Sequence, residues 1–125
     1  MNRITAAVVL LAVSVGLGVG SHFLIENSTT EMIEAMKNDR NLTMQTCEAS
    51  AERAEEIQEL WKSNENILVT LLPHSELDEI EMAIKSLPEF QRQGLNEEYI
   101  KALDDCINRL EHINESEMTN LKNIF

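Results

Sequence analysis

The chain begins with an apolar run that contains no Asp, Glu, Lys or Arg between Ile4 and Ile25. His22 is the only ionisable side chain within this run. A helix over residues 4–25 would be about 33 Å long, and a bilayer hydrocarbon core is about 30 Å thick. We therefore interpret residues 4–25 as a transmembrane helix in contact with membrane lipid. This feature constrains where the rest of the chain can fold.

The charges on the two sides of the run predict its orientation. Arg3 and the amino terminus precede it, and the positive-inside rule keeps such a segment in the cytoplasm. We therefore expect residues 1–3 inside the cell and residues 26–125 outside, as one extracytoplasmic domain. The predicted location is the cell membrane, with a single pass.

A cleaved signal peptide is the alternative reading of the same segment. Gly18 and Gly20 are small residues of the kind found at a cleavage site. The apolar stretch nevertheless resumes at residues 23–25, beyond that site. We therefore expect the segment to stay in place as a signal anchor.

The rest of the chain is strongly acidic. All 22 Asp and Glu residues follow residue 25, and the whole chain carries a net charge of −12. Such a surface repels phosphate backbones, so we expect no nucleic-acid partner. It also favours solubility, which we take as the main consequence of the acidity. Few aromatic residues, 4 Gly and 2 Pro favour helices over a β-sandwich.

Apolar residues recur at spacings of three and four throughout residues 29–122, which is typical of amphipathic helices. The expected elements are a short helix over 29–38, a break in the polar stretch 37–41, a long helix over 42–71, a third helix after Pro73 and a last helix from Asn96 to about Lys122. The expected end signals are capping boxes at Ser28/Glu31 and Ser75/Asp78, a helix end at Pro73, a C-terminal cap at Gly94 and an N-cap at Asn96. Pro88 should kink the third helix or end it about a turn early.

The apolar positions of these helices should form one core. The expected core residues are Met32, Ile33, Met36, Cys47, Ala51, Ala54, Ile57, Trp61, Leu68, Leu71, Leu77, Ile80, Ile84, Leu87, Ile100, Leu103, Ile107, Leu110, Ile113 and Leu121. Short connections place consecutive helices antiparallel. The predicted fold class is all-α: an N-terminal transmembrane helix followed by a small three- or four-helix antiparallel bundle.

Four stretches, in this order, carry a family resemblance. They are Trp61 in the long helix, Pro-His-Ser-Glu-Leu-Asp-Glu-Ile from Pro73, Leu-Glu-His-Ile from Leu110, and the terminal Asn-Leu-Lys-Asn-Ile-Phe. Together with the apolar N-terminal segment, they resemble the DUF4363 family, small proteins of unknown function from clostridia and related spore-forming Firmicutes. Pro88 departs from the helical stretch that this family leads us to expect. The resemblance implies a membrane-anchored helical domain, and no activity, ligand or catalytic residue.

His74 and His112 are the only candidates for a metal site. With Glu76, Asp78 or Glu111 they would form a two-His carboxylate set. Metal sites on helices usually show H-x-x-x-H or E-x-x-H spacing, whereas Glu111 and His112 are adjacent and point about 100° apart. We therefore expect His74 to belong to a helix-start motif and His112 to be a surface residue, with no metal and no cofactor.

Cys47 and Cys106 are an even pair in a domain predicted to lie outside the reducing cytosol, so a disulfide is possible. Each also falls on or beside an apolar stripe and would serve as a small core residue. We favour two buried thiols and keep the bridge as the alternative.

Ala12, Gly16 and Gly20 form a small-xxx-small ridge on one face of the predicted transmembrane helix. Such a ridge lets two membrane helices approach closely. The ordinary use of Gly and Ala in membrane helices also explains this pattern, and we favour that interpretation. Contact with a second copy or with another protein stays the alternative.

The polar residues do not group into a recognisable reactive set, so we expect a protein that is not an enzyme. The function that we expect is a membrane-anchored structural or interaction module at the cell envelope. A sensory or small-ligand-binding helical bundle is the alternative. A polar pocket inside the bundle would favour that alternative, whereas a filled apolar core would favour the first function.

Overall fold

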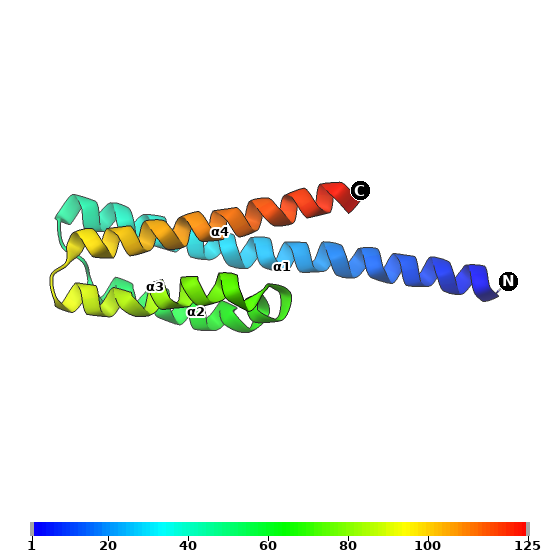
Figure 1. Cartoon of the computed structure of the whole chain (residues 1–125), viewed down its shortest axis with the longest axis horizontal. Coiled ribbons are helices and arrows are strands. Elements are labelled where there is room, and N and C mark those ends of the chain that lie inside the picture. The colour runs from blue at the N-terminus through cyan, green and yellow to red at the C-terminus, as the bar shows by residue number, and fades with distance from the viewer. Residues whose placement is uncertain (1, 125) are drawn as a thin grey trace.

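The computed structural model describes residues 2–124, without the side chains of residues 120, 121 and 124, and every element in this part of the chain is a helix (Figure 1). The elements are α1 (Asn2–Thr46), α2 (Ala51–Leu71), α3 (His74–Arg92) and α4 (Asn96–Ile124).

The second half of α1 forms an antiparallel four-helix bundle with the other three helices (Figure 1). Helix α1 packs against α4 and α2, and α3 packs against the same two helices. The α1–α2 and α3–α4 connections lie at one end of the bundle, which we call the distal end, and the α2–α3 turn lies at the other. The first half of α1 projects beyond the bundle. The predicted all-α fold class is confirmed.

The core contains most of the positions that the helical periodicity predicts. All four positions predicted on α3 are buried, as are Met32, Ile33 and Met36 on α1. The buried residues of α2 and α4 that confirm the pattern are Ala54, Ile57, Trp61, Leu68, Leu103, Ile107, Leu110 and Ile113. Leu71 and Ile100 are half-buried, and Cys47 and Ala51 are exposed because they belong to the α1–α2 connection and the first turn of α2. The prediction for Leu121 lies outside the described side chains.

The break predicted at residues 37–41 is wrong. Helix α1 continues without interruption through that stretch to Thr46, and the connection to α2 follows it. The polar residues there do not form a turn because Asp39 faces the interior of the bundle, where it is 2% exposed. The capping box predicted at Ser28 is also wrong, since Ser28 lies buried in the middle of α1.

Helix α2 begins after Ser50, whose hydroxyl oxygen accepts a hydrogen bond from the backbone N–H of Arg53 at 3.4 Å. This is an N-cap that the sequence reading missed. Its end at Leu71 confirms the prediction that Pro73 terminates the helix. Helix α3 then begins directly at His74, without a side-chain cap, so the capping box predicted at Ser75 is wrong.

Helix α3 passes through Pro88 and ends at Arg92, so Pro88 does not terminate it. Its end is a Schellman motif around Gly94, whose φ is 71°. The N–H of Gly94 donates to Gln91 O at 3.2 Å, and the N–H of Leu95 donates to Phe90 O at 2.9 Å. The prediction of Gly94 as a C-terminal cap is confirmed.

Candidate functional site

The projecting part of α1, residues 2–21, is apolar and almost free of contact with the bundle. Its exposed side chains point to all sides of the helix rather than to one face, as expected of a helix surrounded by lipid. Helix α1 is long and apolar enough to cross a membrane, by length and composition. The large apolar residues that are more than half exposed there are Ile4, Val8, Val9, Leu10, Leu11, Val13 and Leu17.

The ridge formed by Ala12, Gly16 and Gly20 lies on this projecting part, and all three residues are exposed. A Cβ atom added at Gly16 or Gly20 would meet no other atom within 4 Å. The bundle therefore leaves the ridge uncovered, and its contact with a second membrane helix stays a prediction.

His22 and Ile25 mark the point where α1 enters the bundle, and both are buried. His22 Nε2 lies 3.5 Å from Glu26 Oε2, and His22 Nδ1 is buried without a hydrogen-bond partner among the described residues. Protein packing therefore starts one turn before the predicted end of the transmembrane helix. The predicted span and the bundle overlap along α1 instead of being joined by a linker.

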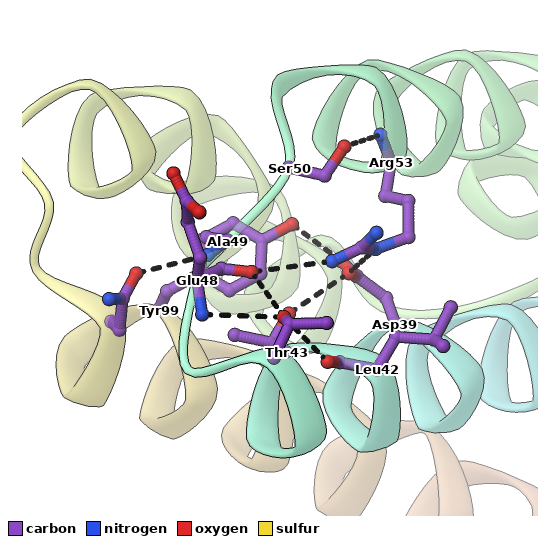
Figure 2. Close-up of polar contacts among 10 residues, drawn as sticks. Asp39, Leu42, Thr43, Glu48, Ala49, Ser50, Arg53 and Tyr99 are labelled. Atoms are coloured by element: carbon purple, nitrogen blue, oxygen red, sulfur yellow. Dashed lines mark hydrogen bonds and ion pairs between the residues drawn. The ribbon is translucent and has the colours of Figure 1, made fainter.

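A buried polar cluster joins three helices near the distal end of the bundle (Figure 2). At its centre is the carboxylate of Asp39 on α1. Its Oδ1 accepts hydrogen bonds from Arg53 Nε of α2 at 2.8 Å and from Thr43 Oγ1 of α1 at 3.3 Å. Its Oδ2 accepts a hydrogen bond from the hydroxyl of Tyr99 on α4 at 2.5 Å. The Asp39 cluster thus consists of Asp39, Thr43, Arg53 and Tyr99.

Burial and hydrogen bonding both affect the chemistry of the Asp39 cluster. Tyr99 and Thr43 are 0% exposed, so their hydroxyl groups depend on protein partners. Burial, followed by the hydrogen bond to Asp39, raises the pKa of Tyr99 above its ordinary value. A tyrosine held in its protonated form is a hydrogen-bond donor and not a base at neutral pH. The cluster therefore fits a structural connection between helices better than proton-transfer chemistry.

At the same end of the bundle, the side chain of Asn96 at the start of α4 binds the α1–α2 connection. Its Nδ2 donates to Cys47 O at 2.8 Å, and its Oδ1 accepts from the N–H of Ala49 at 3.0 Å. The predicted role of Asn96 as the cap of its own helix is wrong, because its side chain binds another part of the chain. Cys47 has a left-handed φ of 57°, which is uncommon for a residue other than glycine. The hydrogen bond from Asn96 to the carbonyl oxygen of Cys47 helps to hold this backbone conformation.

The predicted metal candidates are only partly brought together. His112 on α4 and Glu76 on α3 line a cavity of about 270 Å³ that also includes Arg109, whereas His74 does not line it. Both histidines are exposed. No group of three potential metal ligands was found among the described residues.

The two cysteines lie far apart and both are free thiols. Cys47 is exposed in the α1–α2 connection beside Asn96, and Cys106 lies about 15 Å further along α4. Because a disulfide needs Cα atoms within about 7 Å of one another, this structure does not form the bridge that was kept as the alternative. The favoured prediction of two buried thiols is confirmed for Cys106 and is wrong for Cys47. Burial raises the pKa of the Cys106 thiol to about 12, and its Sγ lies 3.8 Å from Ile80 O.

These features define a class: an all-α protein in which an apolar helix, long enough to cross a membrane, continues without a break into an antiparallel four-helix bundle. A family model described as "Domain of unknown function (DUF4363)" matches residues 19–124, and the chain belongs to this family. No match is found among curated proteins or among solved structures. The matched region covers the whole bundle and begins inside the projecting part of α1.

Proposed function

We propose that this protein is a non-enzymatic structural or interaction module of the cell envelope, anchored by residues 4–25, with its bundle outside the membrane. The observation that carries the proposal is the continuity of α1 from Asn2 to Thr46. A helix without a break holds the bundle at a fixed position relative to the membrane. That arrangement suits a protein that presents a surface at a set height.

The interior of the bundle supports this proposal over a ligand-binding function. Its buried residues form a contiguous apolar cluster that extends over all four helices. In its main polar feature, the Asp39 cluster, the carboxylate of Asp39 is paired with Arg53, Thr43 and Tyr99. A sensory or small-ligand-binding bundle would instead require polar groups directed into an internal pocket.

The two cysteines provide a direct test of anchoring and orientation. Cys47 is exposed at the distal end, and Cys106 is buried, so a membrane-impermeant maleimide should react with one thiol per chain. We expect labelling in intact cells, loss of labelling in Cys47→Ser, and a second reactive thiol only after denaturation. The labelled protein should have the mass of the full-length chain and should remain in the membrane fraction.

Other outcomes would overturn separate parts of the proposal. Labelling that requires cell lysis would place the bundle in the cytoplasm and refute the orientation. A mature protein that lacks its first residues and leaves the membrane fraction would refute the anchor. Neither result would depend on knowing the partner.

A further inference from the structure

Helix α4 extends further along α1 than the other helices do. It contains 29 residues, compared with 21 in α2 and 19 in α3, and it starts at the distal end. It therefore continues about 12 Å past the α2–α3 turn, on the way to the projecting part of α1 (Figure 1). Beyond that turn the molecule consists of two helices.

Contacts between α1 and α4 fix how far this two-helix section reaches. Asn96 binds the residues that follow Thr46, and Arg40 forms an ion pair with Asp104 at 2.9 Å. Counting along both helices from these contacts places the last turn of α4 beside about residues 19–23 of α1. The end of α4 thus lies at the level of the predicted transmembrane helix.

The charge pattern changes at the same height on both helices. The first acidic residue of α1 is Glu26, and the last acidic residue of α4 is Glu117. In the register set by Arg40 and Asp104, Glu26 and Glu117 lie at nearly equal levels. Towards the projecting part of α1, neither helix carries another carboxylate side chain, and Lys122 is the charged residue of the last turn of α4.

Thr119, Lys122 and Asn123 of α4 are exposed and polar, whereas three large exposed side chains of this section are apolar. Phe23 is 57% exposed, Leu24 48% and Met118 48%. They continue the exposed apolar surface of the projecting part of α1, where Leu17 is 67% exposed. Lys122 fits the edge of such a surface because a lysine can extend its ammonium group to the headgroups while its stem stays in the apolar layer.

From these features we propose that the outer leaflet of the membrane surrounds the two-helix section formed by residues 19–25 and 117–124. The membrane surface then lies at the level of Glu26 and Glu117, and the bundle stands directly on it. The lipid layer covers Phe23, Leu24 and Met118. This inference rests on the proposed membrane anchoring and adds a second helix to the membrane contact.

Spin labelling of the full-length chain tests the proposal, because exposed methionines occur at three heights. Met44, Met82 and Met118 are 58%, 67% and 48% exposed, and they lie at the distal end, the middle of the bundle and the two-helix section, respectively. Each would be replaced by Cys in a Cys47→Ser chain, with Leu17→Cys as the reference in the span. The labelled proteins would be placed in vesicles of phosphatidylcholine and phosphatidylglycerol.

The measured quantity is the ratio of nitroxide collisions with oxygen, which concentrates in lipid, to collisions with a water-soluble nickel chelate. We expect a low ratio at Met44→Cys and Met82→Cys, a raised ratio at Met118→Cys and the highest ratio at Leu17→Cys. A raised ratio at Leu17→Cys with a water-like ratio at Met118→Cys would overturn this inference and leave membrane anchoring intact. A water-like ratio at Leu17→Cys would overturn the anchoring itself, and this inference with it.

Discussion

Replacement of Asp39 by Ala should remove the connection between α1, α2 and α4 at the distal end. In the folded protein the carboxylate accepts hydrogen bonds from Arg53, Thr43 and Tyr99. Alanine accepts none of them, and the Tyr99 hydroxyl is then buried without an acceptor. The Arg53 side chain is 24% exposed, so it can turn towards water and recover part of its solvation.

The magnitude follows from these separate effects. A buried hydroxyl without a partner costs about 1–3 kcal/mol, and breaking a buried ion pair costs about 3–5 kcal/mol when the remaining charge stays buried. Because Arg53 can reach water, the lower end of the second range applies. With about 1 kcal/mol for the hydroxyl and about 3 kcal/mol for the ion pair, we expect Asp39→Ala to lower the free energy of unfolding by about 4 kcal/mol.

Trp61 makes the measurement direct. It is the single Trp of the chain and is 5% exposed, so its fluorescence should report unfolding of the bundle. Urea titration of the full-length protein in detergent micelles gives the free energy of unfolding for each variant. Glu55→Ala is the matched control, since Glu55 is an exposed carboxylate on α2, and it should change stability by less than about 0.5 kcal/mol.

A double-mutant cycle tests whether the residues act as one cluster. Tyr99→Phe removes the hydroxyl that Asp39→Ala would leave without an acceptor, so the two losses should not add. We expect the double variant to be about 1–2 kcal/mol more stable than the sum of the single effects implies. Additive losses, or a loss below about 0.5 kcal/mol for Asp39→Ala alone, would refute this reasoning.

Three further predictions concern pH, backbone conformation and thiol reactivity. The folded protein raises the pKa of Tyr99 above its ordinary value of 10.0, so the contribution of Tyr99 to stability should be complete below pH 10 and should decline as the pH rises above 10. In Tyr99→Phe, urea titration should show a smaller loss of stability above pH 10 than in the unchanged protein. Gly94→Ala should cost about 1 kcal/mol in the same titration, because its φ of 71° disfavours a side chain while no atom lies within 4 Å of an added Cβ. Cys106 should resist a thiol reagent at pH 8 in the folded protein, because burial raises its pKa to about 12, and fast modification in Cys47→Ser would contradict its buried position.

The sequence predicted best the elements whose stability comes from their own periodicity. On α3, Leu77, Ile80, Ile84 and Leu87 recur at helical spacing and are all buried. Gly94 was also identifiable, because a glycine after the last apolar turn is the usual signal for a left-handed C-terminal cap. These features depend on residues close in sequence, so a local pattern contains the information needed.

The boundary of α1 was not predictable from the same kind of pattern. Asp39 lies in a polar stretch that resembles a turn, yet its partners Arg53 and Tyr99 are 14 and 60 residues away in the chain. Only contacts made in the folded bundle allow such a carboxylate to be buried. One signal was present: Met36, Asp39 and Thr43 continue the helical spacing of the buried face, which a search restricted to apolar residues misses.

The same long-range contacts explain why the two ends of the bundle differ in chemistry. At the distal end, polar groups of Asp39, Arg53 and Tyr99 set the positions of α1, α2 and α4 through directional hydrogen bonds. At the other end, α1 and α4 continue as a pair in a section that has no carboxylate side chain beyond Glu117 at its border, and a buried ionic cluster there would be costly beside the proposed lipid layer. Since apolar contacts are not directional, they fix the register of two helices less well than hydrogen bonds do. It follows that the polar contacts between α1 and α4, made by Asp39 with Tyr99 and by Arg40 with Asp104, set the register of the two helices, and with it how deeply the last turns of α4 reach towards the proposed membrane surface.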